Sequence, residues 1–168
     1  MLYFAYGSNL NVKQMKYRCP KAVPLGNFYL RDARLLFRGV ADCIYLPGAV
    51  CPGGIWSITS DCERALDRYE GFRKNDPKDG MYYKQIVKIR NADGDVSTEL
   101  MIYRMNSTGI MPPSQMYLDT IAEGYRNFRL PIKRLRQAVK RSYDDKNPSE
   151  VERARYIRNG KPRLARIA

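Results

Sequence analysis

One glutamate in this sequence stands where a negative charge is unfavourable. In a predicted helix that starts at Ser60, Cys62 and Leu66 precede Glu70 by eight and four residues, so Glu70 continues the apolar face of that helix. Glu70 also falls in the last turn, where the helix dipole disfavours a negative charge. Both effects raise the pKa of a carboxyl group, which is typical of an acid–base residue. In the alternative interpretation, Glu70 turns outward or pairs with a basic neighbour: Arg68, Arg73 or Lys74.

The absence of histidine narrows the chemistry that the chain can perform. It excludes every Ser–His and Cys–His mechanism, so acid–base work falls to carboxylates, lysines, tyrosines or cysteines. The cysteines Cys19, Cys43, Cys51 and Cys62 are 24, 8 and 11 residues apart, and none forms a C-x-x-C pair. A zinc site would need all four thiolates from separate elements, so we expect no metal site and reduced, partly buried thiols.

A second candidate for chemistry is the stretch "YFAYGSNL" at residues 3–10. A strand-like alternation runs directly into three turn-forming residues, Gly7, Ser8 and Asn9. One interpretation is a plain tight turn in which Asn9 caps the helix that follows. The other is a loop whose backbone amides hold a small ligand, since glycine lets a backbone approach a ligand closely.

Short strands dominate the rest of the chain. Alternating apolar residues predict strands at residues 2–6, 26–37, 41–46, 54–58, 81–90 and 98–105. The "PGG" at residues 52–54 predicts a turn, and the "ADGD" at residues 92–95 predicts a hairpin connection between the last two strands.

Four helices are predicted among these strands. They cover residues 12–18, with Asn11 as the cap, residues 60–70, residues 114–128 and residues 132–143. Ser60 and Glu63 form a capping box for the second helix, and Gly71 is its C-terminal cap. Strands with inserted and appended helices predict an α+β fold with a small, mixed, mostly antiparallel sheet or barrel.

The 168 residues suit one domain, and the positive charge is concentrated at its end. Residues 133–168 contain 12 Lys and Arg against 4 Asp and Glu, a net charge of +8, whereas the other 132 residues contain 18 against 13, a net charge of +5. We therefore expect a domain at residues 1–143 and a basic C-terminal extension at residues 144–168. The sequence contains neither a long apolar run nor a secretory signal, so we expect a cytoplasmic protein without membrane contact.

Five stretches of this sequence together resemble the γ-glutamylcyclotransferases, a group that includes γ-glutamylamine cyclotransferases and AIG2-like proteins. In order, they are "YFAYGSNL", "GGIWSI", "ALDRYEGF", "GMYYKQIVKI" and "PPSQMYLDTIAEGYRNFRLP". The resemblance spans roughly residues 2–140 and implies a small β-barrel with flanking helices and a cavity at one end. It also implies that Glu70 is the catalytic acid–base and that Tyr82 lines the cavity. The loop that binds the γ-glutamyl group would consist of Tyr6, Gly7, Ser8, Asn9 and Leu10.

The reaction that this resemblance implies needs no cofactor. The α-amine of a γ-glutamyl amide or amine, a small molecule, attacks its own γ-carbonyl and releases 5-oxoproline and the free amine, with Glu70 moving the proton. Backbone amides between Gly7 and Leu10 would stabilise the oxyanion. The alternative is a non-catalytic binding protein of this fold, or a protein or nucleic-acid binder acting through the basic extension. The presence of Glu70 together with the whole glycine loop favours the enzyme. The leaving amine and the oligomeric state stay open.

Overall fold

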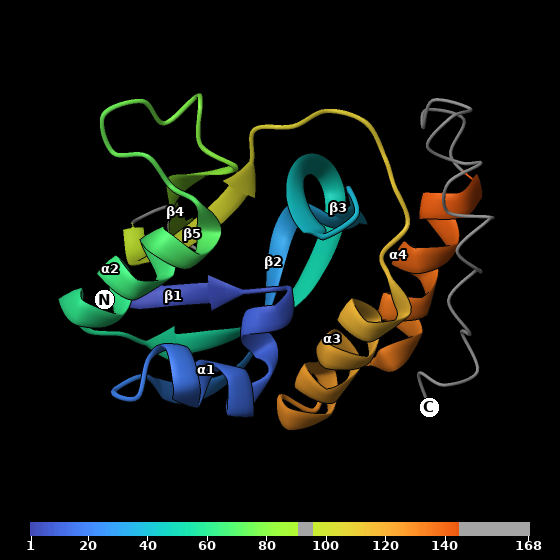
Figure 1. Cartoon of the computed structure of the whole chain (residues 1–168). Helices are drawn as coiled ribbons and strands as arrows, with labels where there is room; N and C mark the ends of the chain where they lie inside the picture. Colours follow the sequence, from blue (N-terminus) through green and yellow to red (C-terminus); the bar gives the residue numbers. More distant parts are fainter. Residues whose placement is uncertain (91–95, 145–168) are drawn as a thin grey trace.

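The computed structural model describes residues 1–90 and 96–144 and has an α+β architecture, as predicted (Figure 1). The strands are β1 (Leu2–Ala5), β2 (Val23–Phe37), β3 (Ala41–Ser57), β4 (Tyr82–Arg90) and β5 (Val96–Met105). The helices are the 3-10 turn η1 (Ser8–Leu10), α1 (Val12–Arg18), α2 (Ser60–Glu70), α3 (Gln115–Asn127) and α4 (Ile132–Asp144). The predicted "ADGD" turn and all but the first residue of the basic extension lie outside the described residues.

The sheet is five-stranded, in the order β2-β3-β1-β5-β4. All neighbouring strands are antiparallel except β1 and β5, which are parallel, so the mixed and mostly antiparallel sheet is confirmed. The short β1 occupies the centre, and three of its four residues are buried. A central strand flanked on both sides is held rigidly, so the turn that follows β1 starts from a fixed point.

The sheet does not close into the barrel that we predicted. Closure would require a ladder of hydrogen bonds between the edge strands β2 and β4, and the strand order ends at these two edges. A groove of about 1060 Å³ separates them and is lined mainly by residues 28–32 of β2 and 85–90 of β4. Large side chains such as Tyr29 and Ile86, both about half exposed, occupy the edges where a ladder would form.

The predicted turn at residues 52–54 is wrong, because these residues lie inside β3 and pair with β2. The glycines are needed there for close packing rather than for a turn. A Cβ on Gly53 would stand 2.4 Å from the Ala5 carbonyl oxygen and from the Phe4 ring, and a Cβ on Gly54 would stand 2.4 Å from the Phe128 ring. Two strand predictions, 41–46 and 54–58, therefore belong to one long bent strand.

The N-cap of helix α2, which carries Glu70, lies one residue before the predicted capping box. Thr59 is the N-cap, and its hydroxyl accepts a hydrogen bond from the amide of Cys62 at 3.2 Å. The prediction of Ser60 as the cap is wrong, since Ser60 is already the first helical residue. The C-terminal cap is confirmed: Gly71 has a φ of 64°, in the left-handed region that glycine favours.

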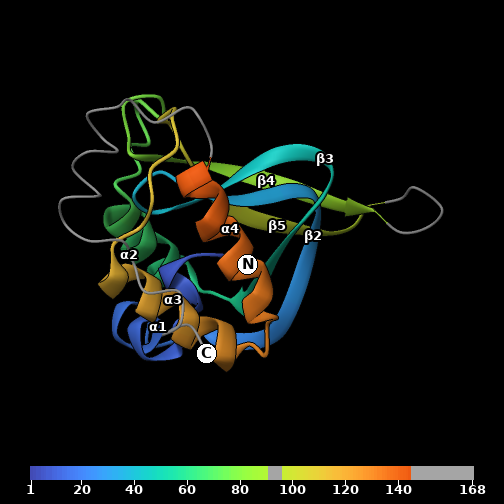
Figure 2. The ribbon, with the colours of Figure 1, turned by 90° about the vertical axis from the view of Figure 1, so that its right-hand side faces the viewer.

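Helices α3 and α4 lie side by side, as Figure 2 shows, and α4 also packs against β2. Helix α3 packs against η1, and α1 contacts η1 and α2. All four cysteines lie within the described residues, and they are buried and free. In the described part of the chain, no helix is long and apolar enough to cross a membrane.

Candidate active site

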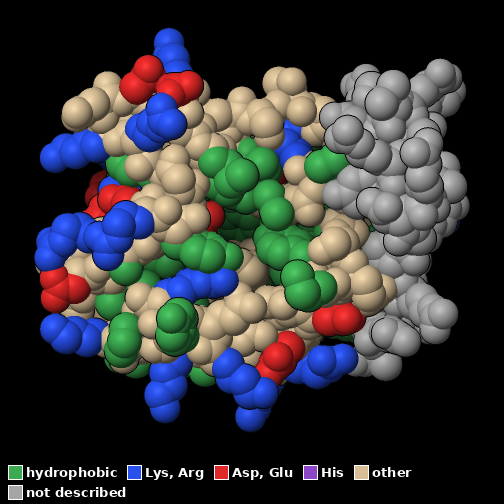
Figure 3. Space-filling view, viewed as in Figure 1, with side chains coloured by type: hydrophobic (Ala, Val, Ile, Leu, Met, Phe, Trp, Pro, Cys, Tyr) green, Lys and Arg blue, Asp and Glu red, His purple; other side chains and the backbone are tan. Residues whose placement is uncertain are grey.

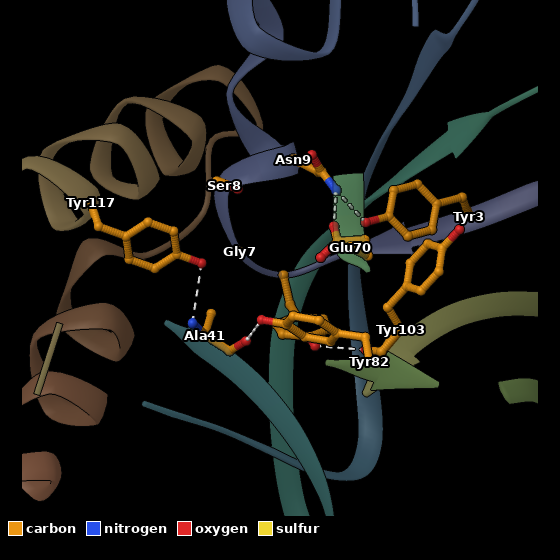
Figure 4. A pocket seen from close by; sticks show the side chains of 10 residues that line it. Tyr3, Gly7, Ser8, Asn9, Ala41, Glu70, Tyr82, Tyr103 and Tyr117 are labelled. Carbon is orange, nitrogen blue, oxygen red and sulfur yellow. Dashed lines mark hydrogen bonds between the residues drawn. The ribbon is translucent and has the colours of Figure 1, made fainter. Parts of the chain in front are cut away.

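A pocket lies where the end of β1 meets the end of α2 (Figure 4). Its enclosed volume of about 20 Å³ has room for about one water. The lining comes from β1 and the turn after it, from α2 and α3, and from the ends of three further strands. The lining residues are Tyr3, Tyr6, Gly7, Ser8, Asn9, Ala41, Glu70, Tyr82, Tyr103 and Tyr117.

Helix α2 is fixed against the sheet by its polar face, and this fixes Glu70. The Lys84 ammonium on β4 donates to Glu63 Oε1 at 2.6 Å and to Asp67 Oδ2 at 3.1 Å. The Tyr103 hydroxyl on β5 donates to Asp67 Oδ1 at 2.5 Å. The helix is therefore tied to both strands of the β4–β5 hairpin, one to two turns before Glu70.

Glu70 faces the pocket and is held there by Asn9. Asn9 is 3% exposed, and its Nδ2 donates to Glu70 Oε1 at 2.7 Å and to the Tyr3 hydroxyl at 2.8 Å. Among the described residues, Glu70 forms no ion pair with Arg68, Arg73 or Lys74. Arg73 pairs with Asp79 instead, and Glu70 accepts its hydrogen bond from Asn9. The carboxyl is therefore directed inward.

Burial raises the pKa of the Glu70 carboxyl from its usual 4.5 to about 7. The hydrogen bond from Asn9 and the charge of Arg18 act in the opposite direction, but the loss of solvation is the larger effect. A carboxyl group with a pKa near 7 is present in both its charged and its neutral form at neutral pH. It can therefore accept a proton and return it.

The turn at Gly7 brings backbone amides to the pocket. It is a 3-10 turn, in which the amides of Leu10 and Asn11 donate to the carbonyls of Gly7 and Ser8. The amides of Ser8 and Asn9 precede the first of these hydrogen bonds, and the cap residue of this turn, Gly7, has no side chain to accept from them. Glycine leaves space here, because a Cβ on Gly7 would stand 3.1 Å from the Ala41 Cβ and 3.2 Å from the Tyr117 hydroxyl, which is closer than ordinary contact.

Two details of this turn differ from the sequence-based expectations. Leu10 does not line the pocket, because its side chain is fully buried and its amide is used within the turn. The plain-turn interpretation required Asn9 to cap the next helix, yet Asn11 is that cap and accepts from the Gln14 amide at 3.1 Å. The Asn9 side chain is directed to Glu70 instead.

Five of the ten residues that line the pocket are tyrosines. Burial raises the pKa of each hydroxyl, so all five are neutral at neutral pH. Two donate their protons to backbone carbonyls: Tyr6 to Tyr103 at 2.6 Å and Tyr82 to Ala41 at 2.9 Å. Tyr3 and Tyr117 accept hydrogen bonds, from the Asn9 side chain and from the Ala41 amide respectively, so each can direct its own proton to a ligand.

The structure brings together six of the seven residues that the sequence singled out. Tyr6, Gly7, Ser8, Asn9, Glu70 and Tyr82 all line the pocket. The sequence reasoning missed the contributions of Tyr3, Ala41, Tyr103 and Tyr117. Tyr3 stands within the quoted "YFAYGSNL" stretch and Tyr117 within "PPSQMY", so proximity to the motifs was their only signal.

These features define an α+β domain whose central strand ends in a glycine turn opposite a partly buried, protonatable glutamate. The chain belongs to the family described as "Gamma-glutamyl cyclotransferase, AIG2-like", whose family model matches residues 3–125. This match includes every residue that lines the pocket.

Individual relatives are similar over most of their length. A protein from Bos taurus named gamma-glutamylcyclotransferase is 30% identical over 166 residues, covering 90% of this chain and 85% of its own. A Homo sapiens protein of the same name is 28% identical with the same coverage. Among solved structures, one titled gamma-glutamyl cyclotransferase superimposes with a TM-score of 0.68 at 27% identity, covering 95% of this chain and 99% of the other.

Proposed function

We propose that this protein is an enzyme that cyclises a γ-glutamyl amide or amine to 5-oxoproline and releases the free amine. The observation that carries the proposal is the inward-facing Glu70 carboxyl, with a pKa of about 7, in one pocket with the Gly7 turn. The family match and the names of the relatives support the same reaction.

The proton on the substrate amine is the first barrier to this reaction. An α-amine has a reference pKa near 8, whereas an ordinary glutamate has one near 4.3, and this gap corresponds to roughly 5 kcal/mol. With Glu70 at about 7, the gap falls to about one pH unit, or roughly 1.4 kcal/mol. Glu70 then accepts one amine proton before the attack, and after ring closure it donates this proton to the leaving amine while the old C–N bond breaks. The ring nitrogen, which has formed the new C–N bond, loses its second proton to the Glu70 carboxylate, which passes it to solvent.

The oxyanion on the attacked carbonyl is the second barrier. The amides of Ser8 and Asn9, two residues that line the pocket, would supply the hydrogen-bond donors on the turn side. A preorganised donor of this kind contributes about 3 kcal/mol to transition-state stabilisation. The hydroxyl protons of Tyr3 and Tyr117 would supply further donors for the substrate α-carboxylate, since the described residues place no Lys or Arg in the pocket lining.

Substrate binding requires the pocket to adapt, since its enclosed volume holds about one water. The γ-glutamyl group would displace this water and spread the wall side chains, and the leaving amine would extend toward solvent. Figure 3, which views the molecule from the same side as Figure 1, shows a hollow at the centre of that face, edged by hydrophobic side chains. Such a tight pocket favours the folded form of the substrate, in which amine and carbonyl are close enough to react.

The test is the formation of 5-oxoproline from γ-glutamyl amides with different leaving groups: a γ-glutamyl amino acid, glutathione and a γ-glutamyl alkylamine. For at least one of them, we expect turnover that falls by roughly 100-fold or more in Glu70→Gln. Glu99→Gln is the matched control, because it removes a carboxylate that is exposed on β5. If no substrate gave more product with the wild type than with Glu70→Gln, the proposal would be wrong.

A further inference from the structure

Arg18, the last residue of α1, does not line the pocket itself but donates hydrogen bonds to three side chains, one of which, Asn9, does. Its Nη1 donates to Asn9 Oδ1 at 2.6 Å. Its Nη2 donates to Gln14 Oε1 at 2.7 Å and to the Tyr69 hydroxyl at 2.6 Å, and its Cζ lies 3.6 Å from the centroid of the Tyr69 ring. The guanidinium group is therefore held between α1 and α2, with one nitrogen directed at Asn9.

This contact determines which way the Asn9 side chain faces. A side-chain amide presents an acceptor on one side and a donor on the other. With Oδ1 facing Arg18, Nδ2 faces Glu70 Oε1 at 2.7 Å. The reverse orientation would place an NH₂ group against the guanidinium and an oxygen against the carboxylate, so it would lose both hydrogen bonds and add two repulsive contacts.

The orientation of Asn9 in turn distinguishes the two oxygens of Glu70. Oε1 accepts a hydrogen bond from Asn9, as Figure 4 shows, so the proton of the neutral acid is placed on the other oxygen. Among the described residues, Oε2 makes no hydrogen bond. We propose that Arg18 is a positioning residue which, through Asn9, reserves Oε2 of Glu70 for proton exchange with the bound substrate. The catalytic part of this inference rests on the function proposed above.

Arg18 also provides the positive charge that acts on this carboxyl. The titratable groups that face Glu70 or surround its pocket are Arg18 from α1, Tyr3 and Tyr6 from β1, Asp42 from β3, Tyr82 from β4, Tyr103 from β5, Tyr117 from α3, and Asp67 and Tyr69 from α2 itself. Of these, Arg18 is the cation, and its charge lowers the pKa of Glu70, as does the Asn9 hydrogen bond. Removing Arg18 weakens both effects and therefore raises this pKa.

The experiment compares Arg18→Met with Lys16→Met, which removes the same charge from an exposed position on the same helix. Two readouts are measured: the pH dependence of kcat and kcat/KM, and the titration of the Glu70 carboxyl by ¹³C NMR, assigned with Glu70→Gln. In Arg18→Met, we expect kcat to fall about 10- to 100-fold, with a smaller change in KM. The acid limb of kcat/KM and the NMR midpoint should both move to higher pH, because the base stays protonated longer.

The control and rescue variants separate positioning from a merely structural role. Lys16→Met should titrate and turn over as the wild type does. Arg18→Lys keeps the charge with a single nitrogen, so it should restore the NMR midpoint more fully than kcat. If Arg18→Met fails to fold, the double variant Gln14→Leu/Tyr69→Phe, which removes both partners of Nη2, should move the midpoint in the same direction by a smaller amount.

The outcomes distinguish this inference from the proposed function. If the wild type turns over substrate but Glu70 titrates alike with and without Arg18, the positioning role is overturned while the enzyme remains. If the wild type turns over no γ-glutamyl substrate, the proposed function fails. A midpoint that still moves in Arg18→Met, but not in Lys16→Met, then supports the control of Glu70 by Arg18.

Discussion

Replacing Glu70 with glutamine is expected to stabilise the protein at alkaline pH even though it removes the proposed base. The folded-state pKa of Glu70, about 7, lies above its usual value of 4.5. A carboxyl with a raised pKa contributes its full stability below the unfolded-state pKa and loses it as the pH rises through the folded-state pKa. The difference of about 2.5 pH units corresponds to at most roughly 3 kcal/mol. The pocket opens to solvent, and water screens part of this effect, so we expect the ionisation of Glu70 to change the free energy of unfolding by about 1–3 kcal/mol.

The assay is urea unfolding of the wild type and Glu70→Gln from about pH 4.5 to about pH 8.5 at constant ionic strength. Subtracting the two free energies of unfolding cancels the groups that both proteins share. The difference should shift in favour of Glu70→Gln by about 1–3 kcal/mol across this range, most steeply between the unfolded-state pKa of 4.5 and the folded-state pKa of about 7, whereas Glu99→Gln should give a flat difference. A flat difference for Glu70→Gln would mean that Glu70 ionises as an exposed carboxyl does, and the argument for a tuned base would fail with it.

Two further substitutions test the local features that position the site. Thr59→Ala removes the hydroxyl that accepts from the Cys62 amide and should destabilise the protein by about 1 kcal/mol in urea unfolding. The neighbouring Ser60→Ala should have almost no effect, and an equal loss in both variants would contradict Thr59 as the cap. Gly53→Ala places a Cβ 2.4 Å from the Phe4 ring and should destabilise by about 1–3 kcal/mol, measured in the same way. Unchanged stability there would mean that β1 and β3 are not as close as the structure places them.

Local sequence signals determined the helices and most of the strands. The α2 helix could be predicted because its apolar spacing and Gly71 act within a few residues, and Gly71 does adopt the left-handed conformation. The Asn11 cap and the β4–β5 pairing follow the same logic. The capping box failed by one residue because Thr59 and Ser60 are both residue types that favour the cap position, and Thr59 takes it although serine is the more common cap.

For the site, the sequence supplied the candidates and the fold brought them together. The position of Glu70 on the apolar face of its helix was enough to indicate burial of the carboxyl. Its partner did not follow from that pattern, because Asn9 is 61 residues away and contacts Glu70 only once α2 is fixed against the sheet. The same holds for Tyr117, which comes from α3.

Composition and short-range periodicity by themselves determined the α+β class, the lack of histidine chemistry and the presence of an unusual glutamate. Tertiary structure alone decided that the sheet stays open, that Gly53 serves close packing rather than a turn, and that Arg18 acts on Glu70 through Asn9. The physical reason is distance along the chain. Capping and periodicity act between neighbours, whereas desolvation and hydrogen bonding in a pocket depend on groups that only the complete fold brings together.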